Sequence, residues 1–189
     1  MAKAREIPGL RTDLPYGEVA ALVLEVRAGE LIEHSKGVLD LGDIERVHAM
    51  RVATRRLRAA IEIFRPCFPK ADGRRALNEV KALADALGER RDRDVAIEAL
   101  AGFAASLPAP DRPGIRSLVN RFESEQTEAN GALAAFVDPA RLEEVRVHIF
   151  ELAAAARAAA VEVDPAEPAS GESSDRGARD DVPPEGSPA

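Results

Sequence analysis

Apolar residues recur at helical spacing through most of the chain, and prolines separate the stretches in which they do so. Between Gly17 and Val38 the apolar positions follow a period near 3.6 residues, which is typical of one buried helix face. Because Pro interrupts helices, the long intervals without Pro outline where helices can form. The pattern predicts five helices, over residues 17–38, 43–64, 73–107, 115–137 and 140–160. No stretch alternates apolar and polar residues as a strand would, so we expect an all-α protein.

Three features predict how these helices begin or bend. Asp43 is placed to cap the second helix at its N-terminus, after a break at residues 39–43. Asp138 is an N-cap candidate for the last helix, with Pro139 at the first helical position. Gly88 marks either a bend in the third helix or the end of one helix and the start of another.

The composition fits helices and excludes several kinds of site. Hydrophobic residues make up 46% of the chain but aromatic residues only 4%, with no Trp, which argues against an all-β sandwich and a base-stacking surface. The single cysteine, Cys67, excludes an internal disulfide and a multi-cysteine metal site, and we expect it to be packed at a helix end. No apolar run is long enough to span a membrane and no secretory signal is present, so the cytoplasm is the expected compartment.

The net charge of −7 conceals two segments of opposite sign. Residues 46–93 carry thirteen Lys and Arg against six Asp and Glu, a local net charge of +7. Residues 162–189 carry eight acids against two arginines, a local net charge of −6, and are rich in Pro, Gly and Ser. Such a segment buries too little apolar surface to offset the entropy of ordering it. We therefore expect a flexible N-terminal arm at residues 1–17, a helical domain at residues 18–160 and a disordered acidic tail at residues 161–189.

The second predicted helix carries two different faces. One arc is apolar and is expected to face the core, and it consists of Met50, Ala53, Leu57, Ala60, Ile61 and Phe64. A neighbouring arc is basic and consists of His48, Arg51, Arg55, Arg58 and Arg65. Like charges three or four residues apart repel one another by a few tenths of a kcal/mol per pair, and a bound anion would relieve that cost. Many charged helix faces are simply solvated, so composition alone leaves both interpretations open.

The sequence of this helix is more specific than its charge. Residues 47–58, which read V-H-A-M-R-V-A-T-R-R-L-R, closely resemble the signature of the conserved-histidine α-helical domain family, called CHAD. A second block resembles another motif of that family, with K-A-L-A at residues 81–84 and L-G-E-R-R-D-R-D-V at residues 87–95. The resemblance covers about residues 18–160. The family fold normally contains two four-helix repeats, and the second signature is missing here, so we expect a helical bundle that corresponds to one half of that fold.

The resemblance implies that basic side chains of the bundle bind inorganic polyphosphate. The residues carried over as the binding set are His48, Arg51, Arg55, Arg56, Arg58, Lys81 and Arg91. Asp92 and Asp94 accompany them in the family pattern, and we expect them to orient Arg91 and its neighbours. The chemistry agrees, because polyphosphate is a linear anion without bases, to which arginine offers a planar fork of donors and lysine a compact charge. Arg93 stands where the family generally has an apolar residue, which either adds charge to the site or marks an exposed helix.

No motif in the chain indicates catalysis, a metal site or a cofactor. The histidines, at positions 34, 48 and 148, lack metal-ligand spacing, and there is no phosphate loop or nucleophile elbow. We expect a structural role for His148, because Glu151 and Ala155 stand where a second arginine signature would need basic residues. The sequence therefore favours a non-enzymatic binding protein.

Other interpretations and partners stay open at this point. The basic face could bind nucleic acid, which the scarce aromatics and the acidic tail disfavour, or it could dock an acidic partner protein. The chain could also be a truncated relic that no longer binds. Half of a two-repeat fold would expose apolar helix faces, so we expect a homodimer, with the Ala-rich residues 152–160 allowing close helix approach. A polyphosphate ligand would associate the protein with polyphosphate granules.

Overall fold

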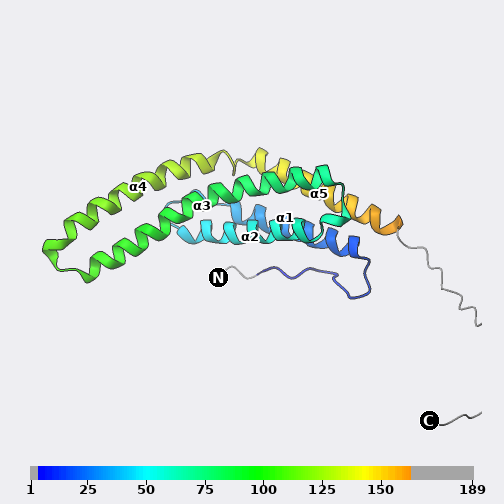
Figure 1. Cartoon of the computed structure of the whole chain (residues 1–189), viewed down its shortest axis with the longest axis horizontal. Coiled ribbons are helices and arrows are strands. Elements are labelled where there is room, and N and C mark those ends of the chain that lie inside the picture. Colours follow the sequence, from blue (N-terminus) through cyan, green and yellow to red (C-terminus); the bar gives the residue numbers. More distant parts are fainter. Residues whose placement is uncertain (1–3, 163–189) are drawn as a thin grey trace, which may run out of the picture.

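The computed structural model describes residues 4–162, and within that part of the chain all regular structure is helical (Figure 1). Five α-helices follow one another, namely α1 (Tyr16–Ser35), α2 (Ile44–Ile63), α3 (Lys70–Ser106), α4 (Arg112–Ala134) and α5 (Pro139–Glu162). Two short 3₁₀ turns, η1 (Arg65–Cys67) and η2 (Ala109–Asp111), connect α2 to α3 and α3 to α4. The all-α class is confirmed, and every predicted helix is present with ends that shift by three residues or fewer. The acidic tail lies almost wholly outside the described residues.

Gly88 does not end a helix, because α3 continues through it for 37 residues in all. A glycine inside a helix costs about 1 kcal/mol relative to alanine, but the buried side chains of Leu83 and Leu87 anchor this part of α3 in the core. A Cβ at Gly88 would lie 3.3 Å from Nη1 of Arg51. The glycine therefore leaves room for the basic side of α2 to approach α3.

The two predicted N-caps behave differently. Asp138 caps α5, since its Oδ1 accepts hydrogen bonds from the backbone N–H groups of Ala140 at 2.9 Å and Arg141 at 3.3 Å. Asp43 occupies the predicted N-cap position of α2, but its side chain makes no capping hydrogen bond, so the expectation that it caps this helix is wrong. Its carboxylate lies 2.9 Å from Nε of Arg46 instead, because an ion pair with the first helical turn replaces the bond to the backbone.

The hydrophobic core lies between α1, α2, α5 and the first half of α3. All six residues of the predicted apolar arc on α2 are buried, namely Met50, Ala53, Leu57, Ala60, Ile61 and Phe64. They meet Leu24 and Leu31 from α1 and Ile149 and Leu152 from α5, which are also buried. Burying each large apolar side chain contributes about 1.5–3 kcal/mol, and this burial fixes the rotation of α2. Because that rotation is fixed, the basic arc of α2 lies beside the core rather than in it.

The small side chains of α5 pack within the chain, against α1. Ala153 and Ala156 are fully buried, and a Cβ at Gly17 would lie 2.2 Å from the backbone oxygen of Ala156. The close approach that alanine permits is therefore made between α5 and α1. Ala154, Ala158 and Ala159 on the other side of α5 stay exposed, so the expected association of two chains through residues 152–160 stays a prediction.

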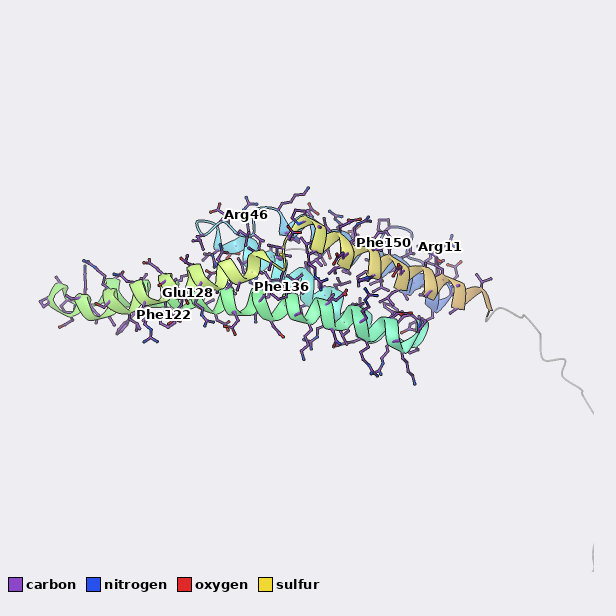
Figure 2. The ribbon with its side chains drawn as sticks, turned by 90° about the horizontal axis from the view of Figure 1, so that it is seen from above. Arg11, Arg46, Phe122, Glu128, Phe136 and Phe150 are labelled. Carbon is purple, nitrogen blue, oxygen red and sulfur yellow. The ribbon has the colours of Figure 1, made fainter. Side chains whose placement is uncertain are left out.

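The second half of α3 and the first half of α4 extend beyond the core as a two-helix hairpin (Figure 1). No residue from 95 to 125 is buried, and Val95, Phe103 and Leu118 are exposed. Phe122 lies on this projecting part of α4, well away from Phe150 of α5 (Figure 2). Two helices alone cannot cover each other's apolar residues, so the hairpin presents apolar surface to solvent.

Candidate anion-binding site

The basic arc of α2 borders a solvent-open hollow between α2 and α3. This central hollow has a volume of about 470 Å³ and is lined by His48, Arg51, Val52, Arg55, Arg56, Arg58, Ala84 and Asp85. Five of the seven predicted binding residues thus line one cavity, and all five come from α2. They converge because residues three and four apart share one side of a helix, and the buried apolar arc turns that side toward the edge of α3.

The arginines of the central hollow differ in how they are held. Nη1 of Arg51 lies 3.7 Å from a carboxylate oxygen of Asp92, and Nε of Arg58 donates a hydrogen bond of 3.1 Å to Glu62. Arg55 has no carboxylate within 4.0 Å among the described residues. The ion pairs of Arg51 and Arg58 are about half exposed, and pairs of that kind contribute only about 0–1 kcal/mol. A multivalent anion can therefore compete for these guanidinium groups.

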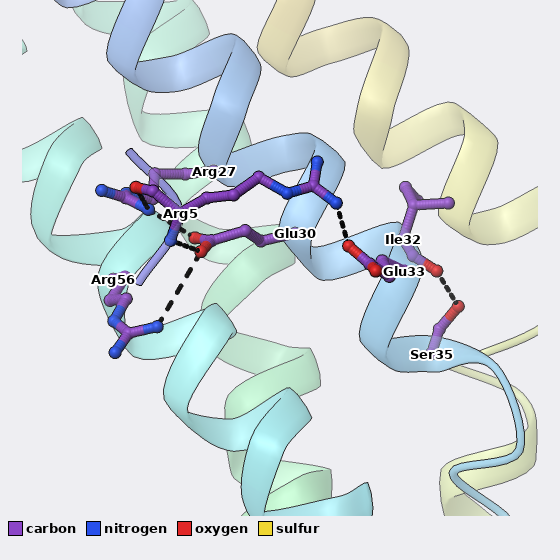
Figure 3. Close-up of polar contacts among 7 residues, drawn as sticks. All are labelled: Arg5, Arg27, Glu30, Ile32, Glu33, Ser35 and Arg56. Carbon is purple, nitrogen blue, oxygen red and sulfur yellow. Dashed lines mark hydrogen bonds and ion pairs between the residues drawn. The ribbon is translucent and has the colours of Figure 1, made fainter. Parts of the chain in front are cut away.

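Arg56 is held from the side facing α1 by the buried carboxylate of Glu30 (Figure 3). One oxygen of Glu30 lies 3.9 Å from Nη1 of Arg56 and accepts a hydrogen bond of 2.6 Å from the backbone N–H of Arg5. The other oxygen accepts a hydrogen bond of 2.7 Å from Arg27. Burial alone would raise the pKa of Glu30, but these hydrogen bonds and the charges of Arg27 and Arg56 outweigh it, so the pKa lies below its ordinary value. An ionised carboxylate thus fixes one side of the hollow.

The same cluster fastens the N-terminal arm to α1. The backbone oxygen of Arg5 accepts a hydrogen bond of 3.2 Å from Arg27, and the Arg5 side chain pairs with Glu33 (Figure 3). Both backbone groups of Arg5 are therefore engaged, together with its guanidinium group. This contact could not be predicted from the sequence, because it depends on the buried position of Glu30, 25 residues further along the chain.

Two of the predicted binding residues do not line the central hollow. Lys81 is exposed on α3, one helical turn before Asp85, and has no carboxylate within 4.0 Å in the described part of the chain. Arg91 points to the start of α2, where Nη1 donates to the backbone oxygen of Ile44 at 3.4 Å and Nη2 lies 3.8 Å from Glu45. Lys81 can therefore extend the hollow along α3, whereas Arg91 braces α3 against the N-terminus of α2.

Neither Asp92 nor Asp94 pairs with Arg91 itself, but each pairs with another arginine, and their expected orienting role stays a prediction. Asp92 lies beside Arg51, and Asp94 forms a completely buried ion pair with Arg90, one turn earlier on α3. Asp94 also accepts a hydrogen bond of 2.7 Å from Nε2 of Gln126 on α4. The reason is geometric, because residues i and i+4 share a helix face and the face of Arg90 and Asp94 is covered by α4.

Arg90 lies within the basic run of residues 90–93 and was not among the residues singled out from the sequence. Burial and the neighbouring charge of Arg91 lower its pKa. The i,i+4 spacing of Arg90 and Asp94 was the available signal. Arg93 pairs with Glu89 one turn earlier on α3, at 2.5 Å, and lies 3.8 Å from Glu125 of α4. Arg93 therefore adds no charge to the central hollow.

The remaining candidate residues, His148 and Cys67, are largely buried and do not line the central hollow. Nδ1 of His148 lies 2.8 Å from Glu79, which joins α5 to α3. Cys67 is buried in η1, and that burial raises the pKa of its thiol. Among residues 4–162, no group of three His, Cys, Asp or Glu side chains could hold a metal ion, and no helix is both long and apolar enough to cross a membrane.

The fold and the central hollow define an all-helical protein with a row of arginines open to solvent between two antiparallel helices. Comparison with protein families matches residues 23–182 to the CHAD domain, and the chain belongs to that family. The match begins within α1, includes α2 and α3, and ends beyond the described residues. No curated protein and no solved structure matches the chain.

Proposed function

We propose that this protein binds inorganic polyphosphate in the central hollow, without catalysing a reaction. The observation that carries the proposal is the clustering of His48 and four arginines of α2 around one cavity. Asp85 is the single carboxylate among the described residues of that lining. Membership of the CHAD family supports the same ligand. An excess of fixed positive charge in an open hollow favours a multivalent anion.

Several cations around α2 and α3 are not neutralised by the protein itself. Five of them have no carboxylate within 4.0 Å among residues 4–162, namely Arg55, Arg65, Lys70, Arg74 and Lys81. On α5, by contrast, Arg141 and Arg146 each pair with a glutamate one turn away, at 2.8 and 2.5 Å. Because like charges repel along one helix pair, a bound polyanion stabilises this arrangement.

Nucleic acid is the main alternative ligand, because the same arginines could neutralise its backbone. Single-stranded nucleic acid is usually held on aromatic side chains as well. The described lining of the central hollow contains no Phe, Tyr or Trp. Polyphosphate has no bases to stack, so its binding requires only cations at repeated spacing. An acidic partner protein is a further alternative, and a chain that binds none of the three would be a relic of its family.

One competition experiment distinguishes these ligands. Labelled long-chain polyphosphate is bound to the full chain and then displaced by unlabelled polyphosphate, single-stranded DNA or duplex DNA at one fixed salt concentration. We expect polyphosphate to compete at a far lower concentration of phosphate groups than either DNA. Equal competition by DNA would instead identify a general polyanion or nucleic-acid binder, and the absence of binding to any of them would refute the proposal.

The proposed partners include a second copy of this chain, for which the projecting α3–α4 hairpin offers a surface in addition to the exposed side of α5. The apolar side chains of Val95, Phe103 and Leu118 are exposed on the hairpin. Residues 95–120 carry two acids and two arginines, so two copies of this region do not repel each other by net charge. In the cell, we propose a cytoplasmic protein that associates with polyphosphate granules.

A further inference from the structure

We propose a second anion subsite at the end of the same groove, which holds the continuation of a long polyphosphate chain. This end hollow has a volume of about 430 Å³ and is lined by Ile61, Glu62, Arg65, Phe68, Lys70, Gly73, Arg74 and Leu77. The inference rests on the proposed function, because the ligand is the same linear polyanion. It adds a separate set of residues and a dependence on chain length.

The two hollows succeed one another along α2 and α3. The central hollow is lined by residues 48–58 of α2 and 84–85 of α3, and the end hollow by residues 61–65 and 70–77. Toward the end hollow, residue numbers increase along α2 and decrease along α3, as expected for an antiparallel pair of helices joined by η1. Arg51 and Glu62 are eleven residues apart on α2, which corresponds to about 16 Å along the helix axis. A long chain can therefore occupy both hollows, whereas a short one reaches only one of them.

The cations of the end hollow are available to a ligand. Arg65, Lys70 and Arg74 are exposed, and none has a carboxylate within 4.0 Å in the described part of the chain. The adjacent Arg75 points to a different face of α3 and lies 3.6 Å from Glu79. Arg75 is thus paired away from this groove, while Arg74, which borders it, keeps its charge.

The floor of the end hollow is apolar, formed in part by Ile61, Phe68 and Leu77. Gly73 belongs to this floor, because a Cβ there would lie 2.6 Å from the Phe68 ring. An apolar floor beneath charged side chains reduces the screening that water provides and strengthens their attraction for an anion.

Glu62 is the one carboxylate in the described lining of the end hollow, and it stands where the two hollows meet. It accepts a hydrogen bond of 3.1 Å from Arg58, which belongs to the central hollow. A chain that spans both hollows must pass this carboxylate. Glu62 therefore opposes the passage of phosphate groups, and its pairing with Arg58 limits the repulsion.

The test compares tripolyphosphate with long-chain polyphosphate on a variant that carries Arg65→Ala, Lys70→Ala and Arg74→Ala. A matched control removes three exposed cations that line neither hollow, with Arg11→Ala, Lys36→Ala and Arg116→Ala. Both variants lose the same net charge, so any difference between them reports position. Circular dichroism confirms that both remain helical.

We expect the end-hollow variant to bind tripolyphosphate as the control does, but to bind long chains at least about tenfold more weakly. The slope of log affinity against log salt for long chains should fall by about 2, as three fewer phosphate contacts release fewer counterions. Equal affinity of the two variants for long chains would overturn the second subsite and leave the proposed function intact. A wild-type protein that binds neither polyphosphate would overturn both.

Discussion

The carboxylate of Glu30 lies 3.9 Å from the guanidinium of Arg56, which makes a buried anion of α1 part of the support of a cationic hollow on α2. The same carboxylate accepts hydrogen bonds from the backbone of Arg5 and from Arg27. Glu30 therefore connects the N-terminal arm, α1 and the central hollow. The arginine that it holds faces both the buried carboxylate and the solvent-open cavity.

Replacing Glu30 by Gln removes this charge while keeping the size of the side chain. The variant leaves Arg27 and Arg56 without their common anion, and we expect it to lower the free energy of unfolding by about 2 kcal/mol at pH 7, since both arginines keep some access to water. Chemical denaturation followed by circular dichroism measures this loss. An unchanged free energy of unfolding would show that Glu30 contributes no net stability.

The same variant tests a pH dependence whose sign follows from the lowered pKa of Glu30. A carboxyl whose pKa is lower in the folded state than its ordinary value of 4.5 stabilises the fold fully above that value. The stabilisation is lost as the pH falls through the lower pKa of the folded state. The difference in unfolding free energy between wild type and Glu30→Gln should therefore be constant above pH 4.5 and shrink below it. A difference that stays constant into strong acid would contradict the assignment.

Reversing the charge of two central arginines, with Arg51→Glu and Arg55→Glu, should abolish polyphosphate binding. Hydrogen bonds to charged groups contribute about 1.5–3 kcal/mol each, so losing two of them weakens binding by at least about a hundredfold. Both side chains are exposed, so helical content should be unchanged. Mobility shift with long-chain polyphosphate measures the affinity. The control, Arg11→Glu with Lys36→Glu, makes the same change in net charge outside both hollows, and an equal loss in the control would point to net charge rather than to the site.

Removing the carboxylate between the two hollows should have the opposite effect. Glu62→Gln frees Arg58 from its ion pair and takes a negative charge out of the groove. We expect long-chain polyphosphate to bind about threefold to tenfold more tightly at low salt, with a smaller gain at high salt because exposed charges are screened. Fluorescence titration at two salt concentrations measures both effects. Weaker binding by this variant would mean that Glu62 positions Arg58 for the ligand.

The acidic segment is expected to compete with the ligand for the basic groove. Residues 162–189 have a local net charge of −6, and residues 46–93 one of +7. Deleting residues 163–189 should therefore strengthen polyphosphate binding at low salt and change it little at high salt. The comparison of full and shortened chains in a salt series checks this. Weaker binding by the shortened chain would show that the segment contributes contacts instead.

Association of two chains through the α3–α4 hairpin is testable by light scattering. We expect a dimer at roughly micromolar concentration, and long-chain polyphosphate should tighten it by bridging two central hollows. Phe103→Glu places a charge among the exposed apolar side chains of the hairpin and should give a monomer with unchanged helical content. A monomer mass for the wild type, with and without polyphosphate, would refute this association.

Local patterns in the sequence predicted most of the helical architecture and the side of α2 that lines the central hollow. Residues such as Met50, Leu57 and Ile61 share one side of α2 by periodicity alone, and burial of that side places Arg51 and Arg55 on its neighbour. Both facts depend only on spacing within one helix, which the sequence states directly. The five residues of α2 in the predicted binding set line a common hollow for this reason.

The tertiary structure decided which helix faces meet, and a single sequence does not encode that by spacing. It buried Arg90 with Asp94 beneath α4, directed Arg91 to the start of α2, and used the small face of α5 against α1. It also aligned Arg65 with Lys70 and Arg74 around the end hollow, because the turn at η1 folds α3 back along α2. The partners of a charged side chain across helices follow from how the helices dock, and docking is determined by packing of the whole core rather than by the residues beside that charge.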